Sequence, residues 1–263
     1  IIKLKQQIKR IVVASSMSVY GEGMYKNIND QIVFPKPRSI EQLKRSQWEL
    51  MDSENQELSP IKTDEKKPLM PESIYAINKR DQEEMCIAIG KAYSIPVTAF
   101  RMFNVYGTRQ SLSNPYTGVV AIFASKLLKN KRPVIFEDGN QIRDFIHIKD
   151  VTKAYVKALE INSHSWDIYN LGSGETTTVK DIAILMSAKL DMQIKPIIDN
   201  HFRSGDIRHC FANIKKINKE LEWYPSFSFS LGLDSMIEWL KKETIVNDEK
   251  NSYTELVDKG LIK

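Results

Sequence analysis

Tyr75 and Lys79 are four residues apart in the segment 73–79, Ser-Ile-Tyr-Ala-Ile-Asn-Lys. On a helix, positions i and i+4 lie one turn apart on the same face, so the phenol and the ammonium group would be neighbours. A cation beside a phenol favours the phenolate form, which can act as a general base. Ser16, in the upstream segment 15–21, could hydrogen-bond the same substrate oxygen that Tyr75 deprotonates. These three residues predict a site that removes a proton from a substrate hydroxyl.

The surroundings of the two segments strengthen this prediction, because a tyrosine and a lysine four residues apart are common on helix surfaces without any chemistry. Residues 10–14, Arg-Ile-Val-Val-Ala, are a short β-branched run typical of a strand buried on both faces. The segment 15–21 follows where that strand would end. Open parallel sheets bind ligands beyond the carboxyl ends of their strands, so hydroxyls at this point are well placed for catalysis.

Strands and helices alternate along the chain, which predicts an α/β fold. We expect strands at residues 10–15, 96–103 and 167–171. We expect helices at residues 73–93, 118–131, 149–161, 179–190, 214–221 and 231–242. Residues 133–136 and 142–148 are expected to form a hairpin around the turn residues 138–140.

A long polar excursion separates the serine segment from the tyrosine segment. It runs from residue 22 to residue 70, contains four prolines and has one helical patch at residues 40–51. A loop of this length inside a compact domain is usually functional or disordered. We treat it as an insertion whose function the sequence does not define.

Five short blocks resemble those of the extended short-chain dehydrogenase/reductase family, and within it the nucleotide-sugar epimerases and dehydratases. The blocks are Ser-Ser-x-x-Val-Tyr-Gly at 15–21, Tyr-x-x-x-Lys at 75–79, Arg-x-Phe-Asn-x-Tyr-Gly at 101–107, Gln-x-Arg-Asp-Phe-x-His at 141–147 and Arg-x-Gly-Asp-x-Arg at 203–208. They occur in the family's order, and the likeness extends from residue 10 to about residue 239. The resemblance implies the C-terminal part of a Rossmann-type doubly wound parallel sheet, at residues 1–112, and a smaller α/β substrate-binding domain at 113–263.

The same resemblance implies NAD as the cofactor and a nucleotide-diphosphate sugar as the substrate. In the implied reaction Tyr75 deprotonates the sugar 4-hydroxyl while hydride passes from C4 to the cofactor. Lys79 favours the phenolate and holds the nicotinamide ribose, and Ser16 steadies the oxygen. The 4-keto sugar then turns over in the pocket and receives the hydride on its other face. Ser15 and Phe103 would join Tyr75 and Lys79 at the cofactor.

The substrate residues implied by the blocks are Asn104, Val119, Arg143, Arg203 and Asp206. A guanidinium fork matches phosphate oxygens in a bidentate way, so Arg143 and Arg203 are the candidates for the diphosphate. The alternative for Arg143 is a structural ion pair with Asp144 or Asp150.

The residues after Ser16 bear on the type of reaction. Nucleotide-sugar 4,6-dehydratases of this family carry Asp-Glu inside the serine block, where this chain has Met17 and Ser18. Elimination of water has no proton donor or acceptor at these positions. The sequence therefore favours 4-epimerisation of a dTDP- or UDP-linked hexose or 6-deoxyhexose, by oxidation and re-reduction at one carbon.

The insertion indicates a subgroup. Segments at 38–43, 48–50, 67–69, 113–119 and 135–139 are similar to those of epimerases that resemble dTDP-L-rhamnose 4-epimerase. Some of these relatives carry a Cys-Pro-x-Cys turn after the tryptophan. Here the turn reads Met-Asp-Ser-Glu, so we expect no metal site.

Family members open with a strand, a Gly-rich turn and a helix that hold the cofactor pyrophosphate, and no such turn precedes Arg10. The Gly-x-Gly at 172–174 has Thr177 where a further glycine is needed, and Thr178 with Asp181 resembles a helix cap. We therefore expect an N-terminally truncated protein that by itself is inactive and binds NAD weakly. Its first strand would have an unpaired edge that invites association.

Composition excludes other classes of protein. With 263 residues and 42% hydrophobic content the chain can bury a sizeable core, and its lysines and arginines are scattered, which argues against a nucleic-acid surface despite a net charge of +5. Cys86 and Cys210 belong to no Cys-x-x-Cys pair, so neither a disulfide nor zinc is expected. The longest apolar stretch, 118–128, is too short to span a bilayer. We expect a cytoplasmic protein without a membrane partner, and the resemblance implies a homodimer.

Two alternatives stay open. The protein could be another nucleotide-sugar enzyme of the family, such as a decarboxylase, a reductase or a dehydratase. It could also be an inactive remnant that binds or supports other molecules. The sequence upstream of Ile1 would discriminate between these hypotheses.

Overall fold

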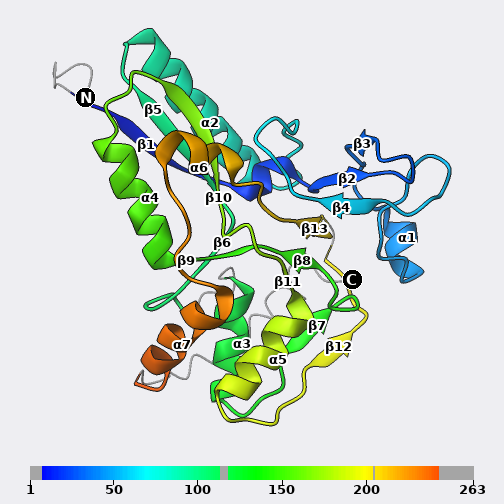
Figure 1. Cartoon of the computed structure of the whole chain (residues 1–263). Coiled ribbons are helices and arrows are strands. Elements are labelled where there is room, and N and C mark those ends of the chain that lie inside the picture. The colour runs from blue at the N-terminus through cyan, green and yellow to red at the C-terminus, as the bar shows by residue number, and fades with distance from the viewer. Residues whose placement is uncertain (1–7, 113–117, 204, 243–263) are drawn as a thin grey trace.

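The computed structural model describes residues 8–112, 118–203 and 205–242 (Figure 1). A three-stranded parallel sheet in the order β1-β5-β10 forms the upper lobe in this view, and helices with short strands form the lower lobe. The sheet consists of β1 (Ile11–Ser16), β5 (Val97–Met102) and β10 (Trp166–Leu171). Ile11 and Trp166 both align with Val97, so the three strands end at the same edge.

The sheet is buried on both faces, as the apolar run at residues 10–14 predicts. Helix α2 (Ile74–Ala92) contacts one face, where Val13, Val97 and Ala99 form a buried cluster. Helices α4 (Ile148–Glu160) and α6 (Lys215–Leu221) contribute to the cluster on the other face, around Phe100 and Tyr169. Side chains alternate between the two faces along each strand, so one strand supplies both clusters.

Helix α2 begins where its sequence predicts. The Ser73 side chain accepts a hydrogen bond from the Ala76 amide, which satisfies one of the free donors of the first turn. The helix runs for 19 residues and ends at Ala92, with Tyr93 as its C-cap. Tyr75 therefore lies in the first turn, at the end of the helix nearest the carboxyl edge of β1.

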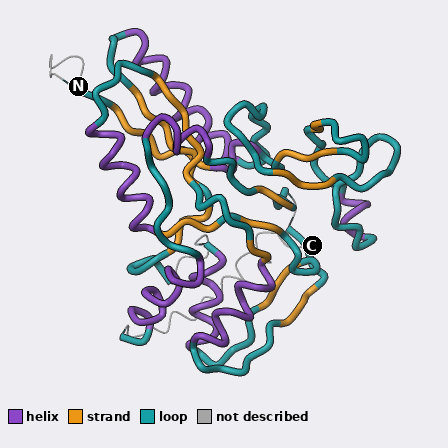
Figure 2. The backbone as a smooth tube through the Cα atoms, in the orientation of Figure 1, coloured by secondary structure: helices purple, strands orange, loops and turns teal. Residues whose placement is uncertain are grey.

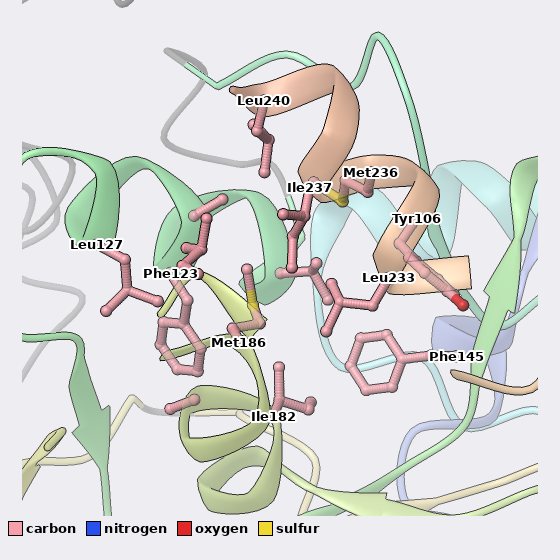
Figure 3. Close-up of a cluster of buried hydrophobic side chains, with 14 of the residues drawn as sticks. Tyr106, Phe123, Leu127, Phe145, Ile182, Met186, Leu233, Met236, Ile237 and Leu240 are labelled. Carbon is pink, nitrogen blue, oxygen red and sulfur yellow. The ribbon is translucent and has the colours of Figure 1, made fainter. Parts of the chain in front are cut away.

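The lower lobe is built around helices α3 (Val119–Leu128), α5 (Val179–Lys189) and α7 (Phe229–Leu240). Figure 3 shows their apolar side chains pointing toward one another, with Tyr106 and Phe145 closing one side. Short strands complete the lobe: β6 (Asn104–Tyr106), β7 (Val134–Phe136), β8 (Ile142–Arg143), β9 (Phe145–His147), β11 (Thr177–Thr178), β12 (Ile197–Asp199) and β13 (His209–Cys210). The expected helices agree with the observed ones to within three residues at each end.

The predicted hairpin at residues 133–136 and 142–148 is wrong. β7 pairs in parallel with β12, β8 lies between β11 and β13, and β9 pairs in parallel with β6 (Figure 1). The chain does turn between β7 and β8, with positive φ at Glu137 and Gly139. The carboxylates of Glu137 and Asp138 are bound by Arg208, however, and each flanking strand takes a partner far along the chain.

The insertion at residues 22–70 is folded. It contains a small antiparallel sheet in the order β3-β2-β4, formed by β2 (Met24–Lys26), β3 (Ile32–Val33) and β4 (Ser59–Ile61). Its helix, α1 (Ile40–Lys44), is shorter than the predicted patch at 40–51. Buried Tyr25, Leu50 and Leu58 give it a core of its own, and Figure 2 shows this segment projecting to one side of the molecule.

The two lobes exchange chain segments. β10, α4 and α6 follow residue 113 in sequence yet pack in the upper lobe, so the division at residues 112 and 113 stays a prediction. The motif residues 113–117 and residue 204 lie outside the described residues. In the part of the chain that the structure describes, no helix is both long and apolar enough to cross a membrane.

Candidate active site

A cavity of about 350 Å³ opens where β1 and β5 end. Five predicted residues line it: Ser15, Ser16, Tyr75, Phe103 and Asn104. They come from three segments of the chain, so the fold brings together residues up to 89 positions apart. The carboxyl edge of the parallel sheet is where ligands are expected in such a fold.

The structure places Lys79 between the tyrosine and the first strand. Its Nζ lies 5.9 Å from the centroid of the Tyr75 ring, within the range of a cation–π contact. The same Nζ donates a 2.8 Å hydrogen bond to the carbonyl of Ala14 and a 3.3 Å bond to Gln82 Oε1. Tyr75 is 58% exposed, so its phenol is open to an incoming ligand.

The neighbouring serines face different surroundings because successive side chains of a strand point in opposite directions. Ser16 Oγ accepts hydrogen bonds from the Ser18 amide at 3.2 Å and the Ser18 hydroxyl at 2.9 Å. The Ser16 hydroxyl proton has no hydrogen-bond acceptor among the described residues, so it can be donated to a substrate oxygen. Ser15 is buried, and its hydroxyl donates to Glu83 Oε2 at 2.6 Å. Its cofactor role stays a prediction.

Glu83 is a residue that sequence reasoning missed. It lies one turn after Lys79 on α2, is buried, and accepts two hydrogen bonds from Arg101, at 2.5 and 3.0 Å. Arg101 also donates to the Tyr20 hydroxyl at 3.0 Å. Burial by itself lowers the pKa of Arg101, but the Glu83 carboxylate and the Tyr20 hydroxyl together outweigh burial, and the net effect raises that pKa. A charged residue at i+4 from Lys79 was the available signal.

Asn104 and Gln110 bring polar groups to the far wall of the cavity. Asn104 Nδ2 donates to the Asp144 carbonyl at 2.8 Å. Gln110 Nε2 donates weakly to the Val105 carbonyl at 3.5 Å, while its buried Oε1 has no hydrogen-bond partner among the described residues. A buried acceptor without a partner costs free energy, so a ligand donor would stabilise it. Nothing in the sequence pointed to Gln110.

Val119 lies beside this cavity without lining it. It is the first residue of α3 and packs partly buried against the core of the lower lobe. Its neighbours Gly118 and Val120 do line the cavity. The start of α3 is thus close to the predicted substrate position.

The predicted diphosphate residues lie away from the cavity walls. Arg143 is buried and donates to three backbone carbonyls: Ile142 at 3.0 Å, Arg208 at 2.8 Å, and Ile207. Its guanidinium therefore supports the loop that contains Ile207 and Arg208. Neither of the alternative ion pairs, with Asp144 or Asp150, occurs among the described contacts. The Asp144 carboxylate accepts from Ser173, Gly174 and Ala212, and the Asp150 carboxylate accepts from the Ser226 and Phe227 amides. Arg203 and Asp206 lie in the same loop, and both are partly exposed.

A second hollow, of about 430 Å³, lies between α4 and residues 222–224. Its lining is mostly apolar and contains none of the predicted site residues. Sites for small molecules combine an apolar wall with a few convergent polar groups. The smaller cavity at the ends of β1 and β5 meets that description better.

Residues 49–172 match the model of the NAD dependent epimerase/dehydratase family. The chain is 34% identical over 252 residues to a dTDP-L-rhamnose 4-epimerase of Burkholderia thailandensis, which covers 95% of this chain and 67% of that protein. It is also 34% identical over 181 residues to a putative UDP-glucose 4-epimerase of Methanocaldococcus jannaschii, covering 69% of this chain and 57% of that protein.

Solved structures have the same fold. A UDP-N-acetylglucosamine 4-epimerase from Methanobrevibacter ruminantium, in complex with UDP-N-acetylmuramic acid, superposes with a TM-score of 0.70 at 27% identity, covering 90% of this chain and 64% of that one. A UDP-glucose 4-epimerase from Thermotoga maritima, with UDP-glucose, gives 0.68 at 27% identity, covering 91% and 66%. The chain spans about two thirds or less of the length of these relatives. The chain is similar to the Burkholderia enzyme over 95% of the chain's own length. This confirms that the chain belongs to the NAD-dependent epimerase/dehydratase family.

Proposed function

We propose that the protein is an NAD-dependent nucleotide-sugar 4-epimerase acting on a dTDP- or UDP-linked hexose or 6-deoxyhexose. The observation that carries this proposal is the meeting of Ser16 and Tyr75 at one cavity, with Lys79 held beside the tyrosine ring. The relatives named above are 4-epimerases of dTDP-L-rhamnose, UDP-glucose and UDP-N-acetylglucosamine, which supports the same reaction type.

Each residue has a part in moving one proton. The Tyr75 oxygen takes the proton of the sugar 4-hydroxyl and later returns a proton to the same oxygen, when hydride has been added back to C4. Lys79 places its positive charge beside the Tyr75 ring, 5.9 Å from the ring centroid. Ser16 donates its free proton to the 4-oxygen and keeps that oxygen in place while the sugar turns.

Phe103 at the cavity, and Lys79 beside Tyr75, fit the nicotinamide end of NAD. Lys79 Nζ has three donors and uses two among the described residues, which leaves one for a ribose hydroxyl. Buried Phe103 supplies an apolar surface at the same cavity. When bound, NAD provides the hydride acceptor and donor that inversion at C4 requires.

The cavity wall argues against the dehydratase alternative. Met17 and Ser18 line the cavity where a 4,6-dehydratase carries its acid and base, and no described lining residue carries a carboxyl group. Loss of water across C5 and C6 needs both a proton donor and an acceptor. Besides the hydride carrier, epimerisation needs a single group that accepts and returns one proton, which is the part that Tyr75 takes in this proposal.

The substrate-binding roles of Asn104, Val119, Arg143, Arg203 and Asp206 belong to this proposal. Asn104 is at the cavity, whereas Arg203 and Asp206 belong to the loop at residues 203–208, and Arg143 donates to the Ile207 and Arg208 carbonyls of that loop. The sugar would lie at the cavity and the nucleotide diphosphate nearer the loop. A homodimeric assembly and a cytoplasmic location also stay predictions.

The test is a product assay with the native full-length protein. dTDP-L-rhamnose, UDP-glucose and UDP-N-acetylglucosamine are incubated separately with enzyme and NAD, and the products are followed by NMR. Inversion at C4 of one of them supports the proposal. A 4-keto-6-deoxy product or carbon dioxide from related substrates, without inversion, would instead identify another reaction of the family.

A further inference from the structure

The insertion at residues 22–70 reaches across the molecule to the loop at residues 203–208. Arg38 is the clearest link, because its side chain is only 2% exposed and donates to groups from three separate segments. Its Nη1 bonds the Trp48 carbonyl at 3.1 Å and Glu137 Oε2 at 2.9 Å, and its Nη2 bonds the Asp206 carbonyl at 2.9 Å. A guanidinium is a rigid planar fork, so one side chain sets the relative positions of all three acceptors.

The other end of the loop is held by the insertion as well. Arg208 is fully buried and forms a bidentate pair with Asp138, at 2.7 and 2.9 Å. It also binds Glu49 of the insertion through Nε, at 3.1 Å, and through Nη2. The second oxygen of Glu49 lies 2.9 Å from His209 Nε2.

The backbone of this loop has a third attachment to the insertion. Glu22, the first residue of the insertion, is buried and accepts hydrogen bonds from the Arg208 amide at 2.8 and 3.0 Å. It also accepts from the His209 amide at 3.3 Å. Farther along, the Thr63 amide donates to the Phe211 carbonyl at 2.8 Å, so the insertion follows the chain beyond the loop (Figure 1).

Burying this network of ion pairs around Arg38 and Arg208 has an unfavourable desolvation free energy. Removing two guanidiniums and several carboxylates from water costs free energy that apolar packing would avoid, and the best-attested use of such a cluster is to fix one geometry. The Asp206 carbonyl and the Arg208 amide, two residues apart, are both fixed by groups from the insertion. Both residues belong to the block to which the resemblance assigns the substrate contacts Arg203 and Asp206.

We propose that Arg38 is a positioning residue for substrate recognition, and that the insertion acts as a brace that holds residues 205–208 in their binding geometry. The inference rests on the proposed function, since it takes Arg203 and Asp206 as contacts of a nucleotide-diphosphate sugar. It gives the insertion a role in affinity for the nucleotide part of the substrate. In this proposal Arg38 takes no part in the proton transfer at Tyr75.

Arg38→Gln removes the fork but leaves Glu137 paired with Arg208 at 3.1 Å, so the network keeps its second cation. Arg45→Gln is the matched control, because Arg45 is an exposed arginine of the same insertion. Hydrogen exchange of the amides at residues 205–209 is measured first, on this chain. We expect exchange at least about tenfold faster in Arg38→Gln, since one charge-assisted hydrogen bond contributes about 1.5–3 kcal/mol. If Arg38→Gln exchanges these amides at the wild-type rate, Arg38 does not hold the loop, and this conclusion does not depend on which substrate the protein binds.

Steady-state kinetics of the native full-length protein then test the link to substrate. We expect KM for the nucleotide sugar to rise about 10- to 100-fold in Arg38→Gln with kcat within about threefold of wild type, because a contact used equally before and during the chemical step affects KM alone. Arg45→Gln should match wild type in both constants. Faster exchange with an unchanged KM overturns the link to recognition. A wild-type protein that turns over no nucleotide sugar overturns the proposed function, and the exchange result still decides whether Arg38 holds the loop.

Discussion

Ser15 Oγ donates a 2.6 Å hydrogen bond to Glu83 Oε2, and both side chains are buried. Ser15 precedes Ser16 on β1, and Glu83 follows Lys79 by one turn on α2. The bond therefore joins the strand that carries the candidate hydroxyl to the helix that carries the candidate base. Arg101 binds the same carboxylate from β5, so three elements of the site are held at one point.

Glu83→Gln should destabilise the chain strongly. The Arg101 guanidinium would stay buried without a charged partner, and breaking one side of a buried ion pair costs about 3–5 kcal/mol. Glu84→Gln is the control, because the Glu84 side chain is 62% exposed and should change the free energy of unfolding by less than about 0.5 kcal/mol. Urea denaturation of both variants measures the difference. Equal stability of the two variants would show that the buried pair does not hold the helix to the sheet.

Tyr75→Phe should abolish turnover in the native full-length protein and leave substrate binding intact. The substitution removes only the oxygen that accepts the proton, and a positioned base contributes about 100- to 10,000-fold to the rate. Tyr93→Phe, at the exposed end of the same helix, should retain full activity. The measurements are kcat by NMR and nucleotide-sugar affinity by calorimetry. Substantial turnover by Tyr75→Phe would rule out this tyrosine as the base.

Ser16→Ala should be milder than Tyr75→Phe. The base would survive, and only the hydrogen bond that orients the 4-oxygen would be lost, which reduces kcat by about 10- to 1000-fold. Ser16 also accepts a hydrogen bond from the Ser18 amide, so a structural effect must be separated from a catalytic one. Ser16→Thr keeps the hydroxyl and should recover much of the rate. A threonine variant as slow as the alanine variant would count against a role for the hydroxyl.

The parts of the fold that local pattern determines could be predicted from the sequence. The β-branched run at residues 10–14 indicated β1, and Ser73 marked the start of α2, because caps and strand propensity act over a few residues. The partner of β7 could not be predicted. β12 lies about sixty residues farther along, and the turn after β7 directs Glu137 and Asp138 toward Arg208 instead of closing a hairpin.

In the candidate site, too, local sequence pattern predicted some contacts, whereas others depend on distant parts of the chain. The spacing of Tyr75 and Lys79 indicated their contact, because helix geometry determines it. The surroundings of Arg143 depend on where the loop at residues 203–208 folds back, and no local pattern reveals that its guanidinium meets carbonyl groups. Similarly, the insertion has strands of only two or three residues, too short for an alternating pattern to be visible.

The stabilisation that Glu49 of the insertion gives to the folded state should decrease as the pH falls. Burial by itself raises the pKa of Glu49, but hydrogen bonds from His209 and Arg208 outweigh it and lower the pKa to about 2, from an ordinary 4.5. A carboxylate whose pKa is lower in the folded state stabilises that state above its unfolded pKa, and the contribution is lost as pH falls toward the folded pKa. The stabilisation by Glu49 should therefore be complete above about pH 5 and disappear between about pH 4.5 and pH 2.

Glu49→Gln isolates this contribution, because a neutral amide resembles the protonated carboxyl group. We expect wild type to exceed Glu49→Gln in free energy of unfolding by an amount on the order of 3 kcal/mol at pH 6, and this gap should close as the pH approaches 2. Glu54→Gln, an exposed site in the same insertion, should show no such pH-dependent gap. Urea denaturation at a series of pH values makes the comparison. A gap for Glu49→Gln that stays constant from pH 6 to pH 2 would mean that the charge of Glu49 does not stabilise the attachment of the insertion to Arg208 and His209.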